Sequence, residues 1–203
     1  MNGGSFMQYL KEEVKNNIIS AAVREFGDKG YHDASMRTIA ANAGVAIGNV
    51  YRYFKNKDEL FNTIVEPVYT KFTSMVFELY QSHQPVPEIH LMAEDITDNI
   101  MEFFAKYETE LFILIYKSKG SKFENLKEEL IRLVDHRIKS ELAPVLKEHG
   151  IVLEDEYIFY VVSATFIEGM FMIISKYKEP DKIKEQIGKL MIIFFDDFYK
   201  NFL

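Results

Sequence analysis

Polar side chains of kinds that bind DNA follow one another in one short stretch of the chain. Asn49 can form paired hydrogen bonds with adenine, and Arg52 can bind guanine or a phosphate oxygen. Tyr51 and Tyr53 each carry a hydroxyl that can donate to phosphate. Gly48 has no side chain, so a helix that contains it can bring its backbone close to a DNA groove. This combination predicts a surface that binds double-stranded DNA.

Helical periodicity places these residues on one side of a short helix. An α-helix advances about 100° per residue, so Gly48 and Arg52 lie almost opposite an inward-facing Val50. Asn49 and Tyr51 then flank the outward face. A helix of about eight residues is about 12 Å long, which is comparable with the width of the major groove. The stretch is therefore predicted to be a recognition helix.

Further phosphate contacts are expected where two neighbouring helices begin. Free backbone N–H groups and the positive end of a helix attract phosphate, and Ser35, Arg37 and Lys57 lie at such starts. From Lys29 to Lys57 there are five basic residues and one acidic residue, a net charge of +4, whereas the whole chain carries −7. A local basic region on an acidic chain is typical of a DNA-reading module, although a solvated charged surface has the same composition. The residues expected to contact DNA are Ser35, Arg37, Ile47, Gly48, Asn49, Tyr51, Arg52, Tyr53 and Lys57.

The spacing of small residues predicts the helix-turn-helix unit that positions this face. Residues 35–42 and 46–53 are expected to form two short helices, with Gly44 in the left-handed turn between them. Ala40 is small enough for the second helix to cross closely. Any compact helix pair has a turn glycine and small inner residues, so the spacing alone does not establish DNA binding.

Helical patterns flank this unit on both sides. An apolar stripe with a period of four runs over residues 10–26, and Gly30 follows as a left-handed stop. A capping box of Asn56 and Glu59 opens a long fourth helix, which Pro67 is expected to kink or break.

After a proline-containing loop at residues 85–87, helical periodicity continues in longer segments. The expected helices cover about 88–107, 111–116, 121–149, 154–177 and 181–202. The segment 111–116 could be a buried strand by composition, but its neighbours are helical. Ser121 and Glu124 form the capping box of the helix that follows. The chain is therefore predicted to be all-α with about nine helices, in an N-terminal helix-turn-helix domain (residues 1–56) and a helical C-terminal domain (residues 57–203).

The combined pattern between Phe26 and Phe61 resembles the DNA-binding domain of the TetR family of bacterial transcriptional regulators. The matching residues are Phe26, Gly30, Tyr31, Ser35, Met36, Arg37, Ile39, Ala40, Ala43, Gly44, Val45, the run from Gly48 to Phe54 and the run from Asn56 to Leu60. The family usually has Ser or Thr where this chain has Ala46, so a capping hydrogen bond of about 1 kcal/mol is lost. The resemblance implies a homodimer, a palindromic operator and a C-terminal domain (residues 57–203) that binds a small-molecule effector and forms the dimer.

The last two helical segments carry more apolar surface than one chain easily covers. The segment 157–175 contains a single charged residue, and the final helix has a wide apolar stripe. Two such helices from each subunit can form a four-helix interface, in which a glycine permits close approach. The expected interface residues are Gly169, Ile187, Met191, Phe194 and Phe198. An ordinary buried helix pair within one chain is the alternative.

Aromatic residues of the second half predict a pocket for an apolar or aromatic ligand. Those on helices expected to converge, together with one methionine, are Phe103, Phe104, Tyr107, Phe112, Tyr116, Phe166 and Met170. The same residues could form ordinary core. Glu168 is the polar group among them, and it either holds a cationic ligand or reaches a Lys or Arg across the dimer.

Other classes of protein receive no support from the sequence. No two of the five histidines have the i,i+4 spacing of a helical metal pair, and no phosphate-binding glycine loop or nucleophilic serine motif occurs. Catalysis, a metal and a cofactor are therefore not expected. The apolar segment 157–175 is nearly long enough to span a membrane, but Glu168 would lie in lipid and no basic cluster flanks it. No signal peptide is recognisable, so a cytoplasmic location is expected.

The sequence thus predicts a DNA-binding transcriptional regulator that acts as a repressor. It is expected to bind a palindromic operator as a homodimer and to be released by a small hydrophobic effector. The alternative is a helical ligand-binding or protein-interaction module without sequence-specific DNA binding. Asn49, Tyr51 and Arg52 favour the regulator, because a protein core needs none of them.

Overall fold

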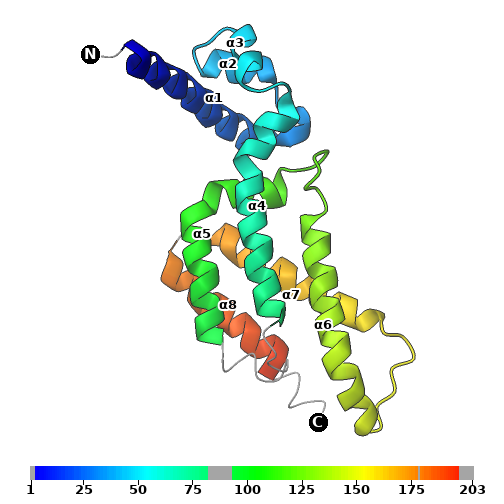
Figure 1. Ribbon diagram of the computed structural model, residues 1–203. Helices are drawn as coiled ribbons and strands as arrows, with labels where there is room; N and C mark the ends of the chain where they lie inside the picture. The colour runs from blue at the N-terminus through cyan, green and yellow to red at the C-terminus, as the bar shows by residue number, and fades with distance from the viewer. Residues whose placement is uncertain (1–2, 82–92, 178, 197–203) are drawn as a thin grey trace. The chain divides into compact units, whose positions relative to one another are not determined.

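The computed structural model describes residues 3–81, 93–177 and 179–196, and every regular element in these ranges is a helix (Figure 1). The elements are α1 (Gly3–Asp33), α2 (Met36–Asn42), α3 (Ile47–Tyr53), α4 (Lys57–Gln81), α5 (Ala93–Tyr116), α6 (Leu126–Glu148), α7 (Tyr157–Lys176), α8 (Pro180–Met191) and the π-helical turn η2 (Ile192–Asp196). The prediction of an all-α protein is confirmed. The expected proline-containing loop at 85–87 lies outside the described residues.

The chain divides into two compact units. Unit 1 comprises Met1–Thr73 and Tyr107–Glu124, and unit 2 comprises Ser74–Lys106 and Asn125–Leu203. The long helices α4 and α5 each contribute residues to both units. Packing thus divides the chain at other places than residues 56 and 57. The boundary predicted there, between a DNA-binding and an effector-binding domain, stays a prediction.

Unit 1 is built on the apolar stripe of α1. Ile18, Ala22 and Phe26 recur every four residues, and all three side chains are fully buried. The ring of Phe26 meets that of Phe61 from α4 edge to face, with 4.9 Å between the ring centroids. The stripe ends before Gly30, whose non-helical backbone (φ 77°, ψ 166°) breaks α1 at the predicted position, although it is extended and not in the left-handed helical conformation.

The start of α4 follows the predicted capping pattern, with one change. The N–H of Glu59 donates to Asn56 Oδ1 at 2.8 Å, as in a capping box. The carboxylate of Glu59 accepts from the N–H of Lys55 at 2.7 Å, one residue earlier than the expected partner. The expected break at Pro67 does not occur, since α4 continues through it. Buried residues on both sides of Pro67 hold the helix against the core of the unit.

Two helix boundaries differ from the predicted ones. The segments expected as separate helices at 88–107 and 111–116 form one element, α5, in which Tyr107 is non-helical (φ −127°, ψ 27°). Helix α6 begins at Leu126 and not at the predicted capping box. Ser121 Oγ accepts from the N–H of Phe123 at 3.2 Å, so this side chain stabilises a local turn before the helix.

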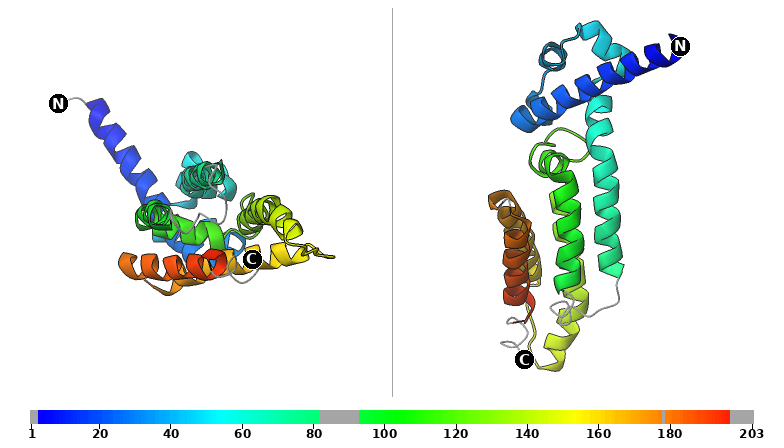
Figure 2. Two further views of the ribbon diagram at one scale, coloured as in Figure 1. Left: turned by 90° about the horizontal axis from the view of Figure 1, so that it is seen from below. Right: turned by 90° about the vertical axis from the view of Figure 1, so that its left-hand side faces the viewer.

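In unit 2, α7 packs against both α6 and α8 (Figure 2). The buried residues of α7 are Phe159, Ser163, Phe166, Ile167 and Phe171. Gly169 lies on the side of α7 that faces α8, where a Cβ would stand 3.2 Å from Leu190 Cδ2. The glycine therefore permits close approach of two helices of the same chain.

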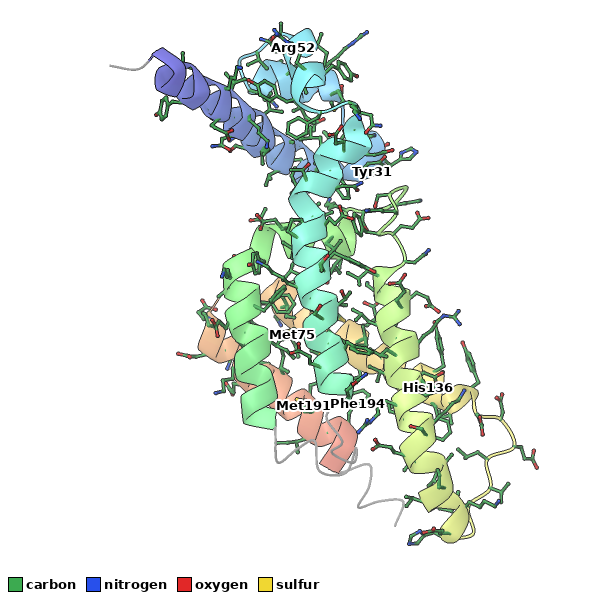
Figure 3. All side chains as sticks on the ribbon, viewed as in Figure 1. Tyr31, Arg52, Met75, His136, Met191 and Phe194 are labelled. Carbon is green, nitrogen blue, oxygen red and sulfur yellow. The ribbon has the colours of Figure 1, made fainter. Side chains whose placement is uncertain are left out.

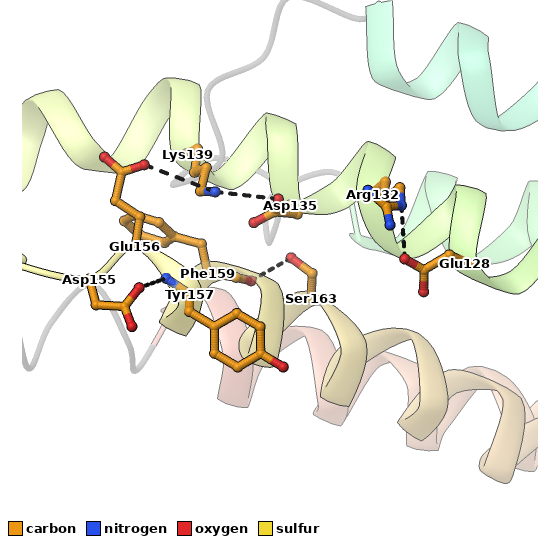
Figure 4. A network of polar contacts seen from close by, with 9 residues as sticks. All are labelled: Glu128, Arg132, Asp135, Lys139, Asp155, Glu156, Tyr157, Phe159 and Ser163. Carbon is orange, nitrogen blue, oxygen red and sulfur yellow. Dashed lines mark hydrogen bonds and ion pairs between the residues drawn. The ribbon is translucent and has the colours of Figure 1, made fainter.

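Polar contacts join α6 to the first turns of α7 (Figure 4). Lys139 Nζ lies 3.6 Å from Asp135 Oδ2 and 4.0 Å from Glu156 Oε2. The hydroxyl of Tyr160 donates to Glu128 Oε2 at 3.0 Å, and this hydrogen bond raises the pKa of Tyr160. Contacts of this partly exposed kind add little stability, so their main effect is to fix how α6 and α7 are placed.

Helix α7 is the one described helix that is long and apolar enough to cross a membrane by length and composition. Only 28% of its most apolar window is buried inside the chain. Among the other residues of this helix, Ile158, Val161 and Met172 are exposed.

Candidate nucleic-acid interface

The turn between α2 and α3 is closed by backbone hydrogen bonds. The N–H of Val45 donates to the carbonyl of Ala40 at 3.0 Å, and the N–H of Gly44 donates to that of Ala41 at 3.1 Å. Gly44 has a φ of 69°, a conformation that strains a residue with a side chain. Val50 is fully buried and anchors α3 against the unit. The predicted helix-turn-helix unit therefore forms, with Gly44 in the expected role.

The outward face of α3 carries most of the residues expected to contact DNA. The exposed residues of α3 are Ile47, Gly48, Asn49, Tyr51 and Arg52. Tyr51 is 50% exposed, whereas Tyr53 is less exposed. Figure 3 shows Arg52 at the outer surface of the helix-turn-helix unit. The structure thus brings these side chains together on one solvent-facing helix.

The first turn of α3 lacks a side-chain cap. Ala46 occupies the N-cap position with an extended backbone (φ −67°, ψ 144°) and makes no side-chain hydrogen bond. The N–H of Asn49 donates to the backbone carbonyl of Ala46 at 2.9 Å. The two N–H groups before it have no intrahelical partner by helix geometry, so a phosphate oxygen can bind there. The contact that a serine hydroxyl would make is replaced by backbone alone.

The start of α2 is held in place from α1. The N–H of Ser35 donates to Glu25 Oε1 at 3.0 Å, and Glu25 is only 8% exposed. Ser35 Oγ caps α2 by accepting from the N–H of Thr38 at 3.5 Å. Arg37 and Thr38 are both exposed, so Thr38 is a further candidate phosphate contact that the sequence analysis missed. A threonine next to Arg37, three residues after a capping serine, was the available signal.

Lys57, which was expected to contact phosphate, makes its contacts within unit 1. Its ammonium group donates to the carbonyl of His32 at 2.9 Å and to that of Ala34 at 3.3 Å. The same nitrogen lies 4.7 Å from the ring centroid of Tyr31. The hydroxyl of Tyr31 donates to the carboxylate of Asp58, and burial together with this bond raises the pKa of Tyr31 to about 12. Two consecutive residues of α4 are thus attached to the last turn of α1 and to Ala34, which follows it.

The residues expected to line an effector pocket fall into both compact units. Phe103, Phe104, Phe166 and Met170 belong to unit 2, whereas Tyr107, Phe112 and Tyr116 belong to unit 1. Phe104 and Phe166 are buried. Phe112 and Tyr116 are about two-fifths exposed, with 5.4 Å between their ring centroids. A single pocket lined by all seven residues therefore stays a prediction.

Glu168 is paired with a residue of its own chain. Lys127 Nζ of α6 donates to the two carboxylate oxygens at 2.9 and 3.1 Å. The side chain of Glu168 is 48% exposed, so its charge remains in contact with water. One of the two predicted alternatives was a Lys or Arg of the second subunit. The partner is indeed a lysine, but it belongs to the same chain.

The residues expected at the dimer interface face the interior of unit 2 where the structure describes them. Ile187 is fully buried and Met191 is 4% exposed, because the stripe of α8 packs onto α7 of the same chain. Gly169 faces Leu190 of that helix, and the half-buried Phe194 ring lies 5.6 Å from the ring of Phe166. Phe198 lies outside the described residues. Ile187 and Met191 have almost no surface left for a second subunit, so an interface needs other residues.

Helix α7 exposes an apolar stripe of its own. Ile158, Val161 and Met172 are 46%, 41% and 66% exposed, and Thr165 lies between them at the same helical spacing. Immediately after α8, Ile192 and Ile193 are also exposed. We call Ile158, Val161, Thr165 and Met172 the α7 stripe. Exposed apolar side chains along one face of a helix make that face a candidate for interaction.

Comparison with known proteins agrees with this geometry. Residues 18–64 match the family model described as bacterial regulatory proteins, tetR family. The chain is 33% identical over 79 residues to an uncharacterized HTH-type transcriptional regulator of Haemophilus influenzae, which covers 39% of this chain and 42% of that protein. It is 38% identical over 61 residues to the fatty acid metabolism regulator protein of Bacillus subtilis, which covers 30% of this chain and 31% of that protein. The matches span less than half the length of these curated relatives.

The fold extends the likeness over most of the chain. A TetR-family regulator from Streptomyces coelicolor has a similar structure, with a TM-score of 0.62 and 18% sequence identity over 88% of this chain and 89% of that one. Fold and site together define an all-helical protein with an N-terminal helix-turn-helix unit. Residues 18–64 thus match the N-terminal domain of the tetR family of bacterial regulatory proteins, and the chain has the fold of that family.

Proposed function

We propose that this protein is a transcriptional repressor that binds a palindromic operator as a homodimer and is released by a small hydrophobic effector. The outward face of α3 is the observation that carries this proposal. Val50 is the only buried residue of that helix, and five of its seven residues are exposed. The amide of Asn49 and the guanidinium of Arg52 lie together on this exposed face, and both groups can bind base edges in the major groove.

Each part of this face has a distinct role at the operator. Asn49 reads adenine, and Arg52 binds guanine or phosphate. Gly48 permits close approach of the backbone, and Ile47 offers an apolar contact to a thymine methyl group. The remaining proposed contacts are to phosphate, from Ser35, Arg37, Thr38, Tyr51 and Tyr53.

The homodimer is proposed to form through the α7 stripe. This stripe is apolar and lies outside the packing of unit 2, and a second copy of the same surface can cover it by twofold symmetry. Two recognition helices are then held about 34 Å apart, or at a multiple of this distance, to reach successive major grooves. Operator DNA as the partner implies a cytoplasmic location.

The effector site is proposed to lie in unit 2, which holds six of the nine methionines. The candidate lining residues described there are Phe103, Phe104, Phe166 and Met170. Side chains of these kinds suit a hydrophobic ligand. The name of the Bacillus subtilis relative refers to fatty acid metabolism, and a fatty acid would be a hydrophobic ligand. The similarity to that relative covers 30% of this chain.

Release from the operator needs a connection from α5 to the helix-turn-helix unit. The backbone N–H of Tyr31 donates to the carbonyl of Lys117 at 2.7 Å, and Lys117 Nζ donates to the carbonyl of Asp28 at 3.4 Å. A Cβ at Gly30 would lie 3.3 Å from the same Lys117 carbonyl oxygen. The segment after α5 thus fits closely against the end of α1. We propose that a ligand acts through this contact as well as through α4, which leaves the DNA-binding unit directly.

Selection of bound fragments from a pool of random duplex DNA tests the proposal. A recovered palindrome, with half-sites spaced for two recognition helices, is the expected result. If no duplex is enriched in low salt and without any small molecule, the alternative of a helical module without sequence-specific DNA binding replaces it.

The effector is tested separately, with the recovered duplex. Titration of fatty acids and other lipophilic compounds into the complex should release DNA and raise the melting temperature of the free protein. Compounds that raise the melting temperature without releasing DNA would contradict a role as inducers.

A further inference from the structure

We propose that Lys57 positions the helix-turn-helix unit from inside unit 1 and does not bind phosphate. The inference rests on the proposed DNA-binding function, and it changes the role of a residue that the sequence analysis placed at the DNA surface.

The contacts of the Lys57 ammonium group are the first argument. The group has three N–H donors, and two of them are directed to the carbonyls of His32 and Ala34 at 2.9 and 3.3 Å. The ring of Tyr31, with its centroid at 4.7 Å, covers another side of the same cation. A phosphate that took both of these donors would have to replace the two carbonyls.

The position of those carbonyls is the second argument. Ala34 immediately precedes Ser35, which caps α2 and whose own N–H is held by Glu25. Asp58, the next residue of α4, accepts the hydroxyl of Tyr31. Lys57 and Asp58 therefore fasten both ends of residues 31–34 to α4. The direction in which α2 and α3 leave this segment depends on that attachment.

The start of α4 is also a poor phosphate site in other respects. The N–H of Glu59 is bound by Asn56 Oδ1, and the N–H of Lys55 is bound by the Glu59 carboxylate. The first turn carries two acidic side chains, Asp58 and Glu59. Negative charge there competes with an incoming phosphate for the positive end of the helix.

The experiment compares three variants on the duplex selected with the wild-type protein. Lys57→Met keeps the aliphatic stem and removes the charge, Tyr31→Phe removes one hydroxyl without changing charge, and Arg37→Met removes an exposed cation at the start of α2. Affinity is measured as a function of salt concentration for the operator and for an unrelated duplex.

Lys57→Met should lower operator affinity roughly tenfold, as expected for loss of hydrogen bonds from a charged group. Its slope of log K against log salt should match the wild type, whereas Arg37→Met should flatten the slope by about 0.9 per half-site. Tyr31→Phe should also lower operator affinity, but by a smaller factor than Lys57→Met. Both variants should affect the operator more than the unrelated duplex, because a positioning defect spoils the fit of α3.

The proposal is overturned if Lys57→Met flattens the salt slope by about 0.9 per half-site while Tyr31→Phe binds as the wild type does. Amide hydrogen exchange of the DNA-free proteins gives a second and independent test. Lys57→Met should speed exchange at Ser35 and leave the amides of α7 unchanged, and unchanged exchange at Ser35 would also overturn the proposal. This measurement applies even if the wild-type protein selects no duplex, a result that would remove the proposed function instead.

Discussion

Helices α3 and α7 both present exposed side chains, but the two surfaces have opposite chemistry. Helix α3 has seven residues, one of them buried, and shows solvent a glycine, an amide, a phenol and a guanidinium. Helix α7 has 20 residues, five of them buried, and shows solvent an apolar stripe. The short helix depends on its turn and on a single anchor, whereas the long helix is held along its length by α6 and α8.

The difference shows what each surface needs from a partner. The polar groups of α3 are satisfied by water until DNA replaces it, so the free protein tolerates their exposure. Burial of the α7 stripe lowers the free energy of the protein by roughly 25 cal/mol for each Å² of apolar surface removed from water. We therefore expect the DNA surface to be reversible and salt-dependent, and the α7 surface to be covered most of the time.

The largest expected effect comes from the anchor of α3. Val50→Asp places a charge in a fully buried site, which should destabilise unit 1 by more than about 4 kcal/mol and abolish DNA binding. Ile47→Asp, on the exposed side of the same helix, should abolish operator binding but keep the melting temperature. Circular dichroism melting separates the two variants. Equal melting temperatures would mean that Val50 is not the anchor.

A charge in the α7 stripe should have the next largest effect. Met172→Glu should weaken the dimer by at least about 2 kcal/mol, or roughly thirtyfold in dissociation constant, because the carboxylate would be buried against a second subunit. Val152→Glu is the matched control, since Val152 is 76% exposed and lies outside α7. Sedimentation equilibrium measures both. Dimers of unchanged stability in Met172→Glu would place the interface elsewhere.

Base readout by α3 should be sensitive to a smaller change. Asn49→Ala should lower the ratio of operator to non-specific affinity by about 1–3 kcal/mol, because paired hydrogen bonds to one base are lost. Competition between the selected duplex and a scrambled duplex measures that ratio. If both affinities fall by the same factor, Asn49 has no part in direct readout.

The smallest expected change is in the salt dependence. If Arg52 binds phosphate, Arg52→Met should flatten the slope of log K against log salt by about 0.9 per half-site, whereas a guanine contact would leave the slope closer to that of the wild type. Arg132→Met is the control, because Arg132 is an exposed arginine of α6 in unit 2. An effect of both variants of the same size would indicate a general influence of net charge.

The helix-turn-helix unit could be predicted from the sequence because its signals are local. Gly44 has the φ that its turn requires, Val50 is buried, and Asn56 caps α4, as the residue types indicate. Propensity and periodicity act over a few residues, so one sequence is enough to recognise them. The start of α6 was predicted at the wrong residue, because serine is a common N-cap residue but Ser121 stabilises a turn before the helix.

The partners of long side chains could not be predicted in the same way. Lys57 was expected to point towards DNA, and it instead binds the carbonyls of His32 and Ala34 from more than 20 residues away. Glu168 was expected to hold a cationic ligand or to reach a Lys or Arg across the dimer, and it pairs with Lys127 of its own chain. A flexible cation or carboxylate can reach several partners, and only the packing of the helices decides which of them is within reach.

The amino-acid order by itself determined that the chain is all-helical, that α3 is exposed on one face and that Ala46 cannot cap it. These properties follow from backbone preferences and from the period of apolar residues within one element. The tertiary structure decided which apolar stripe is left uncovered. The stripes of α7 and α8 are both apolar in sequence, but α8 turns Ile187 and Met191 onto α7 and leaves Ile158, Val161 and Met172 in solvent. Which stripe stays exposed depends on how one helix is rotated against the other. Contacts between residues far apart in the sequence together fix that rotation.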